Sequence, residues 1–401
     1  MITALRFVLV VIVVMFSTTL GGCMDAAKET KIKANQGNAS AQNKLGVMYL
    51  IGEGVQKNDV EAVKWFRKSA EQGNIEGQKR MGQVYRDGLG VPRDALKAAE
   101  WLRKAAKQGD IGAQNRLASM YDTGYGNLSE DGVEAAQWRI EAAKHGNEFA
   151  QDVLFYNVVN NNNNPEDTLG IAKLTLMAAE EGYAFAQNNM GHMYRSGIGV
   201  PKNGTEAVKW LHKAAEQDNA YSFFSLGWAY ETGDGVASNG NEAEKWYLKA
   251  AKQGDAAAQF NLGLMYSRGE VVPEDAKEAF KWFLKASEQS YAMAQYLLGK
   301  MYANGQGVPE NDSEAVRWFR KAAVQGDALA QAALGYMDSR GEGVPKDDVK
   351  AYQWYSLAAT QGNKTGKNNK PIVASRMTSE QIAEAQKLST SCYSSNYEAC
   401  E

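Results

Sequence analysis

The stretch that decides the fold is AQFNLGLMYSRGEVVPEDAKEAFKWFLKASEQSYAM, residues 258–293. Its first half carries apolar residues at the spacing of one helical face, namely Ala258, Leu262, Met265 and Tyr266. Its second half carries another stripe of the same period, namely Ala279, Trp282, Phe283 and Ala286. Glycine and proline between the two halves indicate a turn. The stretch therefore predicts two helices that pack as a pair.

The same pattern recurs along the chain every 36 or 37 residues. Eight tryptophans mark it: Trp65, Trp101, Trp138, Trp210, Trp246, Trp282, Trp318 and Trp354. One interval of 72 residues holds Leu174 at the missing place. The nine aligned repeats begin at Ala41, Gly77, Ala113, Ala150, Ala186, Ser222, Ala258, Ala294 and Ala330. One helix pair cannot bury its stripes alone, whereas stacked pairs share a continuous core. The period therefore predicts an all-α solenoid with these tryptophans in its core.

Two consensus segments, AQxxLGxMYxxGxG and EAxKWxxKAAxQG, run through most of eight repeats. They resemble Sel1-like repeats, which are relatives of the tetratricopeptide repeat, over residues 41–363. The resemblance implies a right-handed α-solenoid superhelix of about nine 36-residue helix–turn–helix repeats. It says less about function, because the family supplies scaffolds and adaptors with many different partners.

The N-terminus resembles a bacterial export signal. Arg6 precedes an apolar run from Phe7 to Phe16, and Leu20-Gly21-Gly22-Cys23 resembles a lipobox. We expect residues 1–22 to be a signal peptide that is removed. An ordinary cleaved signal peptide without lipidation is one alternative. An uncleaved membrane helix is another, although the apolar run is shorter than the roughly 20 residues that span a bilayer.

If the lipobox is used, the mature protein begins at Cys23, and lipid on this cysteine is its only expected contact with the membrane. Residues 23–40 then form the lipidated N-terminus and a starting helix near residues 28–37. Met24 is not the aspartate that retains lipoproteins at the inner membrane of enteric bacteria. The resemblance therefore points to a periplasmic protein anchored in the outer membrane.

Beyond Asn363 the repeat pattern stops, and residues 364–401 are expected to close the solenoid. Residues 364–370 are polar and rich in lysine, and they predict a linker. The run Thr378-Ser379-Glu380-Gln381 predicts a capping box that opens a capping helix through about residue 389. Cys392 and Cys400 predict a disulfide in an oxidising compartment, worth about 2–3 kcal/mol.

Two repeats depart from the pattern. The third has one extra residue in its turn, residues 124–132. The fourth has Phe155, Val158 and Leu174 where the others have glycine, tyrosine and tryptophan, and its turn holds the asparagines of residues 160–164. These asparagines predict a projecting flexible loop. The departures are read either as drift in a tolerant turn or as a change of superhelix pitch that shapes a binding site.

The sequence holds no catalytic motif that we can assign. A net charge of −3 provides no basic excess for nucleic acid. The glycine-rich turns do not continue as GxGxxG, and neither GxSxG nor HExxH is present. We therefore expect no enzyme activity, no cofactor and no metal. A β-lactam-interacting hydrolase is an alternative suggested by some relatives, but no serine has a lysine three residues later.

Function is then expected on residues that stacking does not need. In the first helix of each repeat, the third, seventh and tenth places lie opposite the core face. In tetratricopeptide-like solenoids that side lines a concave groove, and the resemblance implies the same here. Early repeats are mostly polar there, whereas later repeats carry Tyr156, His192, Phe224, Trp228, Phe260, Leu264, Tyr296 and Tyr336. We expect these residues to bind a partner. Tight curvature that buries the rings is the alternative.

These inferences favour a non-catalytic protein-binding scaffold or adaptor of the bacterial envelope. It would be a monomer that recognises a protein or peptide in its groove. An immunity protein that neutralises a secreted effector acting in the periplasm is the alternative, since some exported Sel1-like proteins have that role.

Overall fold

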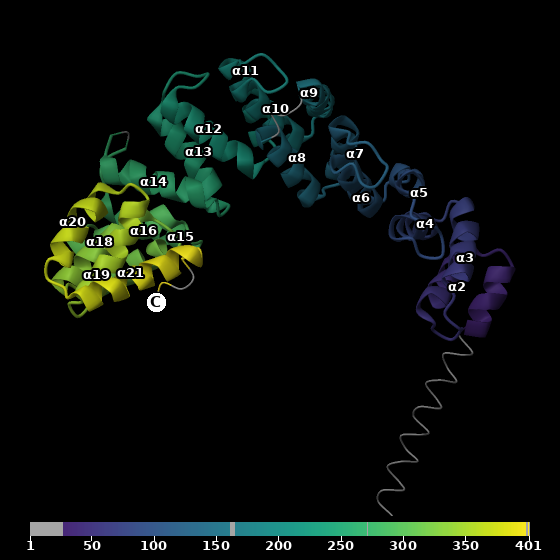
Figure 1. Ribbon diagram of the computed structural model, residues 1–401. Helices are drawn as coiled ribbons and strands as arrows, with labels where there is room; N and C mark the ends of the chain where they lie inside the picture. The colour runs from purple at the N-terminus through teal and green to yellow at the C-terminus, as the bar shows by residue number, and fades with distance from the viewer. Residues whose placement is uncertain (1–26, 161–164, 271, 398–399, 401) are drawn as a thin grey trace, which may run out of the picture. The chain divides into compact units, whose positions relative to one another are not determined.

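The computed structural model describes residues 27–160, 165–270, 272–397 and 400, and all regular structure in them is helical (Figure 1). The predicted signal peptide, the lipidation site Cys23 and residues 161–164 of the asparagine-rich turn lie outside the described residues. The chain forms two compact units, an N-terminal unit of residues 1–203 and a C-terminal unit of residues 204–401. Within the described residues, no helix is both long and apolar enough to cross a bilayer.

The helices follow the predicted order of pairs. Helical residues 27–35 come first, as expected for a starting helix. The first helix of each pair, the A helix, is α2 (Ala39–Ile51), α4 (Ile75–Asp87), α6 (Ile111–Asp122), α8 (Glu148–Asn160), α10 (Ala184–Ser196), α12 (Ala220–Thr232), α14 (Ala256–Arg268), α16 (Ala292–Asn304) or α18 (Ala328–Arg340). The second, the B helix, is α3 (Asp59–Glu71), α5 (Ala95–Lys107), α7 (Gly132–Lys144), α9 (Pro165–Glu180), α11 (Gly204–Ala215), α13 (Gly240–Lys252), α15 (Ala276–Glu288), α17 (Asp312–Ala323) or α19 (Asp348–Thr360). From α2 to α7 and from α11 to α19, each helix packs on the next, which confirms the all-α solenoid fold.

A glycine in the A helix lets the two helices of a pair approach closely. A Cβ on Gly263 would lie 2.6 Å from two ring carbons of Phe283, the residue after the repeat tryptophan. The same contact recurs between Gly46 and Phe66, Gly227 and Tyr247, Gly299 and Phe319, and Gly335 and Tyr355. The ring therefore occupies the space that a side chain on the A helix would need, and this glycine sets the distance between the helices.

Two glutamines of the repeat consensus form hydrogen bonds that join neighbouring helices. Gln259 of α14 donates to the carbonyl of Ala251 at 3.1 Å and so caps the end of the preceding B helix. Gln289, at the end of α15, donates to the Gln259 side-chain oxygen at 2.9 Å. The side-chain pair recurs as Gln72–Gln42, Gln108–Gln78, Gln325–Gln295 and Gln361–Gln331. Each pair ties the end of a B helix to the A helix of the same repeat.

The C-terminal segment corrects one prediction. The expected linker at residues 364–370 is part of a helix, α20 (Lys364–Ala374). Asn363 caps it by accepting from the Gly366 backbone N–H at 2.9 Å. A Cβ on Gly366 would lie 2.7 Å from the Tyr355 carbonyl oxygen, so this glycine permits close packing on α19. The segment therefore begins like the A helix of a further repeat, and the lysine-rich composition hid this similarity.

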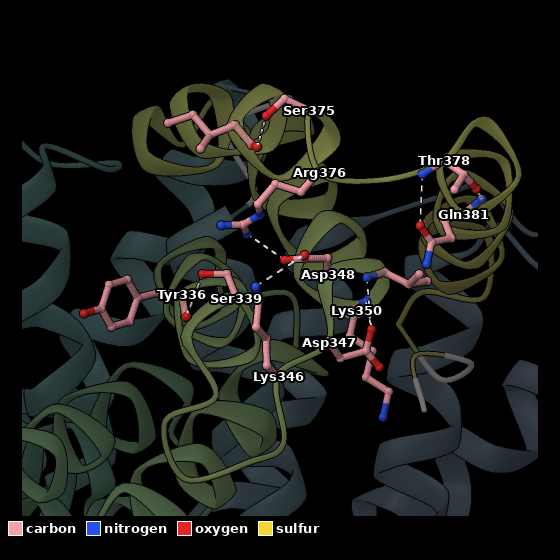
Figure 2. A network of polar contacts seen from close by, with 12 residues as sticks. Tyr336, Ser339, Lys346, Asp347, Asp348, Lys350, Ser375, Arg376, Thr378 and Gln381 are labelled. Carbon is pink, nitrogen blue, oxygen red and sulfur yellow. Dashed lines mark hydrogen bonds and ion pairs between the residues drawn. The ribbon is translucent and has the colours of Figure 1, made fainter.

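The predicted capping helix is present as α21 (Ser379–Ser394), and the Thr378–Gln381 capping box is confirmed (Figure 2). The link between α20 and α21 is held to the last repeat by charge. Figure 2 shows Arg376 bonded to the Asp348 carboxylate at 2.6 Å, with Lys346 at 3.8 Å from the other oxygen. These groups are partly exposed, so they position the cap more than they stabilise it.

The predicted disulfide between Cys392 and Cys400 is present, and both cysteines are buried. They join a hydrophobic cluster that contains Trp354 and Leu357 of the last B helix. In six other repeats a lysine stands three residues after the tryptophan, where the last repeat has Leu357. The disulfide-closed tail therefore covers the end of the apolar core.

Candidate functional site

The repeat tryptophans belong to the core, as predicted. Seven are buried, and Trp101 is half-buried. A lysine amine lies 3.8–4.4 Å from the ring centre of six of them, three residues further along the helix: Lys68, Lys104, Lys213, Lys249, Lys285 and Lys321. This cation–π contact closes the outer side of the ring. The tryptophans of the 36-residue pattern therefore serve the core of the solenoid.

The eight residues predicted to bind a partner fall into three groups. Tyr156 and Tyr336 are exposed, at 65% and 42%. Five are half-buried: Phe224, Trp228, Phe260, Leu264 and Tyr296. His192 is buried at 8% exposure. Seven of the eight side chains are thus at least partly accessible to solvent, whereas the His192 side chain is buried.

Packing inside each repeat fixes the half-buried rings. Phe224 lies 5.7 Å from Tyr247, and Phe260 lies 5.9 Å from Phe283, measured between ring centres. Tyr296 has the same relation to Phe319, at 5.8 Å. Each ring therefore packs against the ring that fills the space beside the A-helix glycine. This packing holds the conformation of the half-buried ring in the absence of a partner.

His192 corrects the prediction for the fifth repeat. Its ring stands edge-on to Phe155 at 4.8 Å, and its Nδ1 lies 3.1 Å from an Arg195 nitrogen. Burial lowers the His192 pKa to about 3, so the ring is neutral. Phe155 stands where other repeats have the packing glycine, and its ring lies against His192. The sequence showed the replacement but not the direction of the new ring.

Sequence reasoning missed the first turn of the same helix face. Tyr221, Met293 and Leu329 stand three residues before Phe224, Tyr296 and Ala332, and they are exposed at 52%, 37% and 43%. Residues at i, i+3 and i+7 share one side of a helix. We define the apolar A-face as Tyr221, Phe224, Trp228, Phe260, Leu264, Met293, Tyr296, Leu297, Leu329 and Tyr336. Extending the helical period backward from Phe224 and Tyr296 would have found the missing members.

The apolar A-face runs over four successive A helices of the C-terminal unit, α12, α14, α16 and α18 (Figure 1). Lys300 is exposed at the seventh place of α16, where the neighbouring A helices carry Leu264 and Tyr336. Burial raises the pKa of Tyr296, and the charge of Asp327 adds to the effect, so its hydroxyl stays protonated. The face is therefore mainly apolar, with the Lys300 amine on it and the Arg340 guanidinium 5.7 Å from the Tyr336 ring centre.

The N-terminal unit has a different A-face. The fourth places of its first three A helices hold Lys44, Arg80 and Arg116. In α8 of the fourth repeat the fourth place instead holds Val153, which is half-buried. Phe149 and Tyr156 lie on the same side of α8 and are strongly exposed. The sequence alone shows this contrast between a basic and an apolar face, at repeat positions that the core does not use.

Potential metal ligands and cavities in the described part of the chain bear on chemistry other than binding. No three His, Cys, Asp or Glu side chains there come together as a metal site would require. Two open cavities that include arginines lie between repeats, one of about 390 Å³ near Arg86 and Arg116 and one of about 380 Å³ near Arg320. Neither holds a paired nucleophile and base.

Eight segments of the chain match the Sel1 repeat: residues 39–74, 75–110, 111–147, 184–219, 224–255, 256–291, 292–327 and 328–363. These segments cover more than half of the chain. The protein is therefore a Sel1-repeat α-solenoid and belongs to the Sel1 repeat family. Residues 148–183, the fourth repeat, lie between matched segments, in agreement with its replaced glycine and tryptophan.

Solved structures support the assignment. The chain is 38% identical to a protective antigen of uropathogenic Escherichia coli strains that displays an SLR fold, over 94% of this chain and 81% of that one, with a TM-score of 0.60. It is 30% identical to a Sel1 repeat protein from Oxalobacter formigenes, over 85% and 88%, with a TM-score of 0.61. An immunity protein from Pseudomonas aeruginosa is 23% identical over 54% and 83%, with a TM-score of 0.34, too low to carry an argument. No protein of curated function matches the chain.

Proposed function

We propose that the protein is a non-catalytic scaffold of the bacterial envelope that binds a protein partner on the apolar A-face. One observation carries the proposal. Four large apolar side chains, Tyr221, Met293, Leu329 and Tyr336, are exposed on one side of A helices that already bury their other side. Surfaces of this kind mark interaction sites in soluble proteins.

The arrangement suits recognition of an apolar segment. Phe224, Phe260 and Tyr296 are held by ring contacts at their bases, so binding costs little of their side-chain entropy. Around them stand exposed side chains that a partner would cover. Trp228 lies one helical turn after Phe224 and is half-buried, the environment in which interface hot spots are found. An apolar helix or strand of the partner would thus meet a preformed row of anchors.

We also propose that the protein is exported and anchored by lipid on Cys23. The export signal and lipobox described above support this, and a relative 38% identical is described as a protective antigen, which suits a location outside the cytoplasm. Metabolic labelling with a tagged fatty acid tests the anchor. Wild type should be labelled and should fractionate with the outer membrane, whereas Cys23→Ala should lose both properties. Label retained by Cys23→Ala would refute the anchor.

The partner is tested by affinity purification from crosslinked envelopes of the native host. We expect Tyr221→Ala and Trp228→Ala to lose a protein that wild type retains. Tyr393→Ala is the matched control, because Tyr393 is equally exposed but lies on α21, which packs on the B helix α19. Equal recovery from Tyr221→Ala and Tyr393→Ala, with both variants folded by circular dichroism, would refute the site. A co-encoded toxic effector as the recovered protein would identify an immunity function.

A further inference from the structure

The ninth place of the A helix holds a tyrosine in seven repeats: Tyr49, Tyr85, Tyr121, Tyr194, Tyr230, Tyr266 and Tyr302. The fourth repeat has Val158 there, and the last repeat has Asp338. Aspartate is far shorter than tyrosine and carries no ring. The last repeat therefore lacks a ring that most others place between neighbouring repeats.

The surroundings of Tyr85 show what that ring does. Tyr85 packs in one hydrophobic cluster with Val63 of the preceding B helix. The Arg67 guanidinium, also on that B helix, donates to the Tyr85 hydroxyl at 2.9 Å. The Lys97 amine lies 5.6 Å from the ring centre. Arg103 and Tyr121 repeat the arginine–hydroxyl bond in the next repeat. Valine, arginine and lysine thus form a socket for a phenol ring.

The residues that surround the Tyr85 ring recur around Asp338, but no aromatic ring is present there. In the repeat alignment Val316, Arg320 and Lys350 occupy the places of Val63, Arg67 and Lys97. Arg320 and Lys350 both act electrostatically on the Asp338 carboxylate, which places them around it. Asp338 itself is 4% exposed. Three of the four members of the Tyr85 arrangement are therefore retained, and only the aromatic one is replaced.

A cavity of about 380 Å³ opens beside this socket, between α17 and the turn of the last repeat. Three valines line it, Val316, Val324 and Val344, together with Arg320. Of the other cations on its rim, Arg317 pairs with Glu314 and Lys321 lies over the Trp318 ring. The Arg320 guanidinium makes no hydrogen bond or ion pair within the described chain. The volume is in the range of sites that take small ligands.

We propose that this cavity is a binding site for a phenol ring, supplied by a tyrosine side chain of a partner segment. The ring would lie among Val316, Val324 and Val344, and its hydroxyl would accept a hydrogen bond from Arg320, as Tyr85 does from Arg67 within the chain. The site lies on α17 and the turn between α18 and α19, outside the apolar A-face, so it is independent of the function proposed above.

The minimal probe is p-cresol, the side chain of tyrosine, titrated into the purified full chain by isothermal calorimetry. We expect one saturable site in wild type and binding weaker by about tenfold for toluene, which has no hydroxyl to accept from Arg320. Asp338→Tyr should abolish the site, because the chain then fills its own socket. Arg320→Leu should weaken p-cresol binding by about tenfold, because the variant has no guanidinium to donate to the hydroxyl. The variant should fold, since leucine stands at this place in two other repeats, as Leu248 and Leu284.

Tyr85→Asp is the matched gain-of-site control. It recreates the arrangement with Val63, Arg67 and Lys97 and should raise the p-cresol stoichiometry from one to two. The peptide acetyl-Gly-Tyr-Gly-amide distinguishes a tyrosine side chain from a free phenol as the natural occupant. Competition of the peptide with p-cresol supports a partner's tyrosine, whereas binding of p-cresol without binding of the peptide would overturn it. Unchanged p-cresol affinity in Asp338→Tyr, or no saturable binding to wild type, would overturn the site. Should Tyr85→Asp fail to fold, the wild-type and Asp338→Tyr titrations decide alone.

Discussion

His145 leaves a gap in the glutamine pairs that can be repaired. It stands at the B-helix place where five other repeats carry the donor glutamine. In this repeat the side-chain oxygen of Gln114 is buried and has no hydrogen-bond partner among the described residues. The backbone at His145 (φ −90°, ψ 15°) nearly matches that at Gln108 (φ −87°, ψ 7°), which does donate to its partner. His145→Gln should therefore place its amide on Gln114 without any change of backbone.

The size of the effect follows from the bond that is gained. A buried acceptor left without a partner costs about 1–3 kcal/mol, and a typical net hydrogen bond contributes about 0.5–1.5 kcal/mol. Ordering an exposed glutamine side chain opposes this by up to about 1.5 kcal/mol. We therefore expect a net local stabilisation of about 1 kcal/mol, which corresponds to roughly fivefold slower local opening.

Hydrogen–deuterium exchange measures that opening directly. The backbone amides of α6 and α7 should exchange about fivefold more slowly in His145→Gln than in wild type, while α2 and α3 should be unchanged. His145→Ala removes the imidazole without supplying a donor, so it should give no protection. Equal protection in the glutamine and alanine variants would refute the role given to the glutamine pairs.

Three further predictions concern stability. Ser290 holds φ at 63°, where seven repeats have glycine at φ of 79–99°. Ser290→Gly should therefore stabilise the C-terminal unit by up to about 1 kcal/mol in urea denaturation, and a loss of stability would contradict the strain. Burial raises the Asp338 pKa to about 6, above its value of 3.8 in an unfolded chain, so stability should fall as pH rises from 4 through 6. Asp338→Asn should then be more stable than wild type at pH 7.5, by at most about 3 kcal/mol and less where water reaches the carboxylate, with no advantage at pH 4. Cys392→Ser should lower stability by about 2.6 kcal/mol through loss of the short loop, and a reductant should lower wild type to the same level; an unchanged unfolding midpoint would argue against a stabilising tail.

Much of the fold could be predicted because each core position is repeated. The residues represented by Trp282 and Gly263 recur at fixed places. With nine repeats, the shared pattern remains clear although single repeats depart from it. The helix α20 could not be predicted in this way, because few of its residues match the repeat. Asn363, Gly366 and Val373 stand at repeat places, but Lys364, Lys367 and Lys370 lie among them. Local composition outweighed these matches, although Gly366 packs closely on α19 and Val373 is buried.

The candidate site was predicted less completely. Phe224 and Trp228 were found from helical periodicity, yet Tyr221 was missed because the alignment started one residue later, at Ser222. The burial of His192 depends on the orientation of the Phe155 ring, which is set by contacts between two A helices and not by spacing along one. Whether the apolar A-face binds a partner remains a prediction, as does lipidation of Cys23.

Site-specific photocrosslinking tests the binding face most directly. Benzoylphenylalanine would replace Tyr221 or Tyr336 on the face and, separately, Tyr393 on α21, in the protein expressed in its native envelope. The account predicts the same discrete protein adduct from positions 221 and 336 and none from position 393. Adducts from position 393 alone, or the same adducts from all three positions, would contradict a partner bound on the apolar A-face.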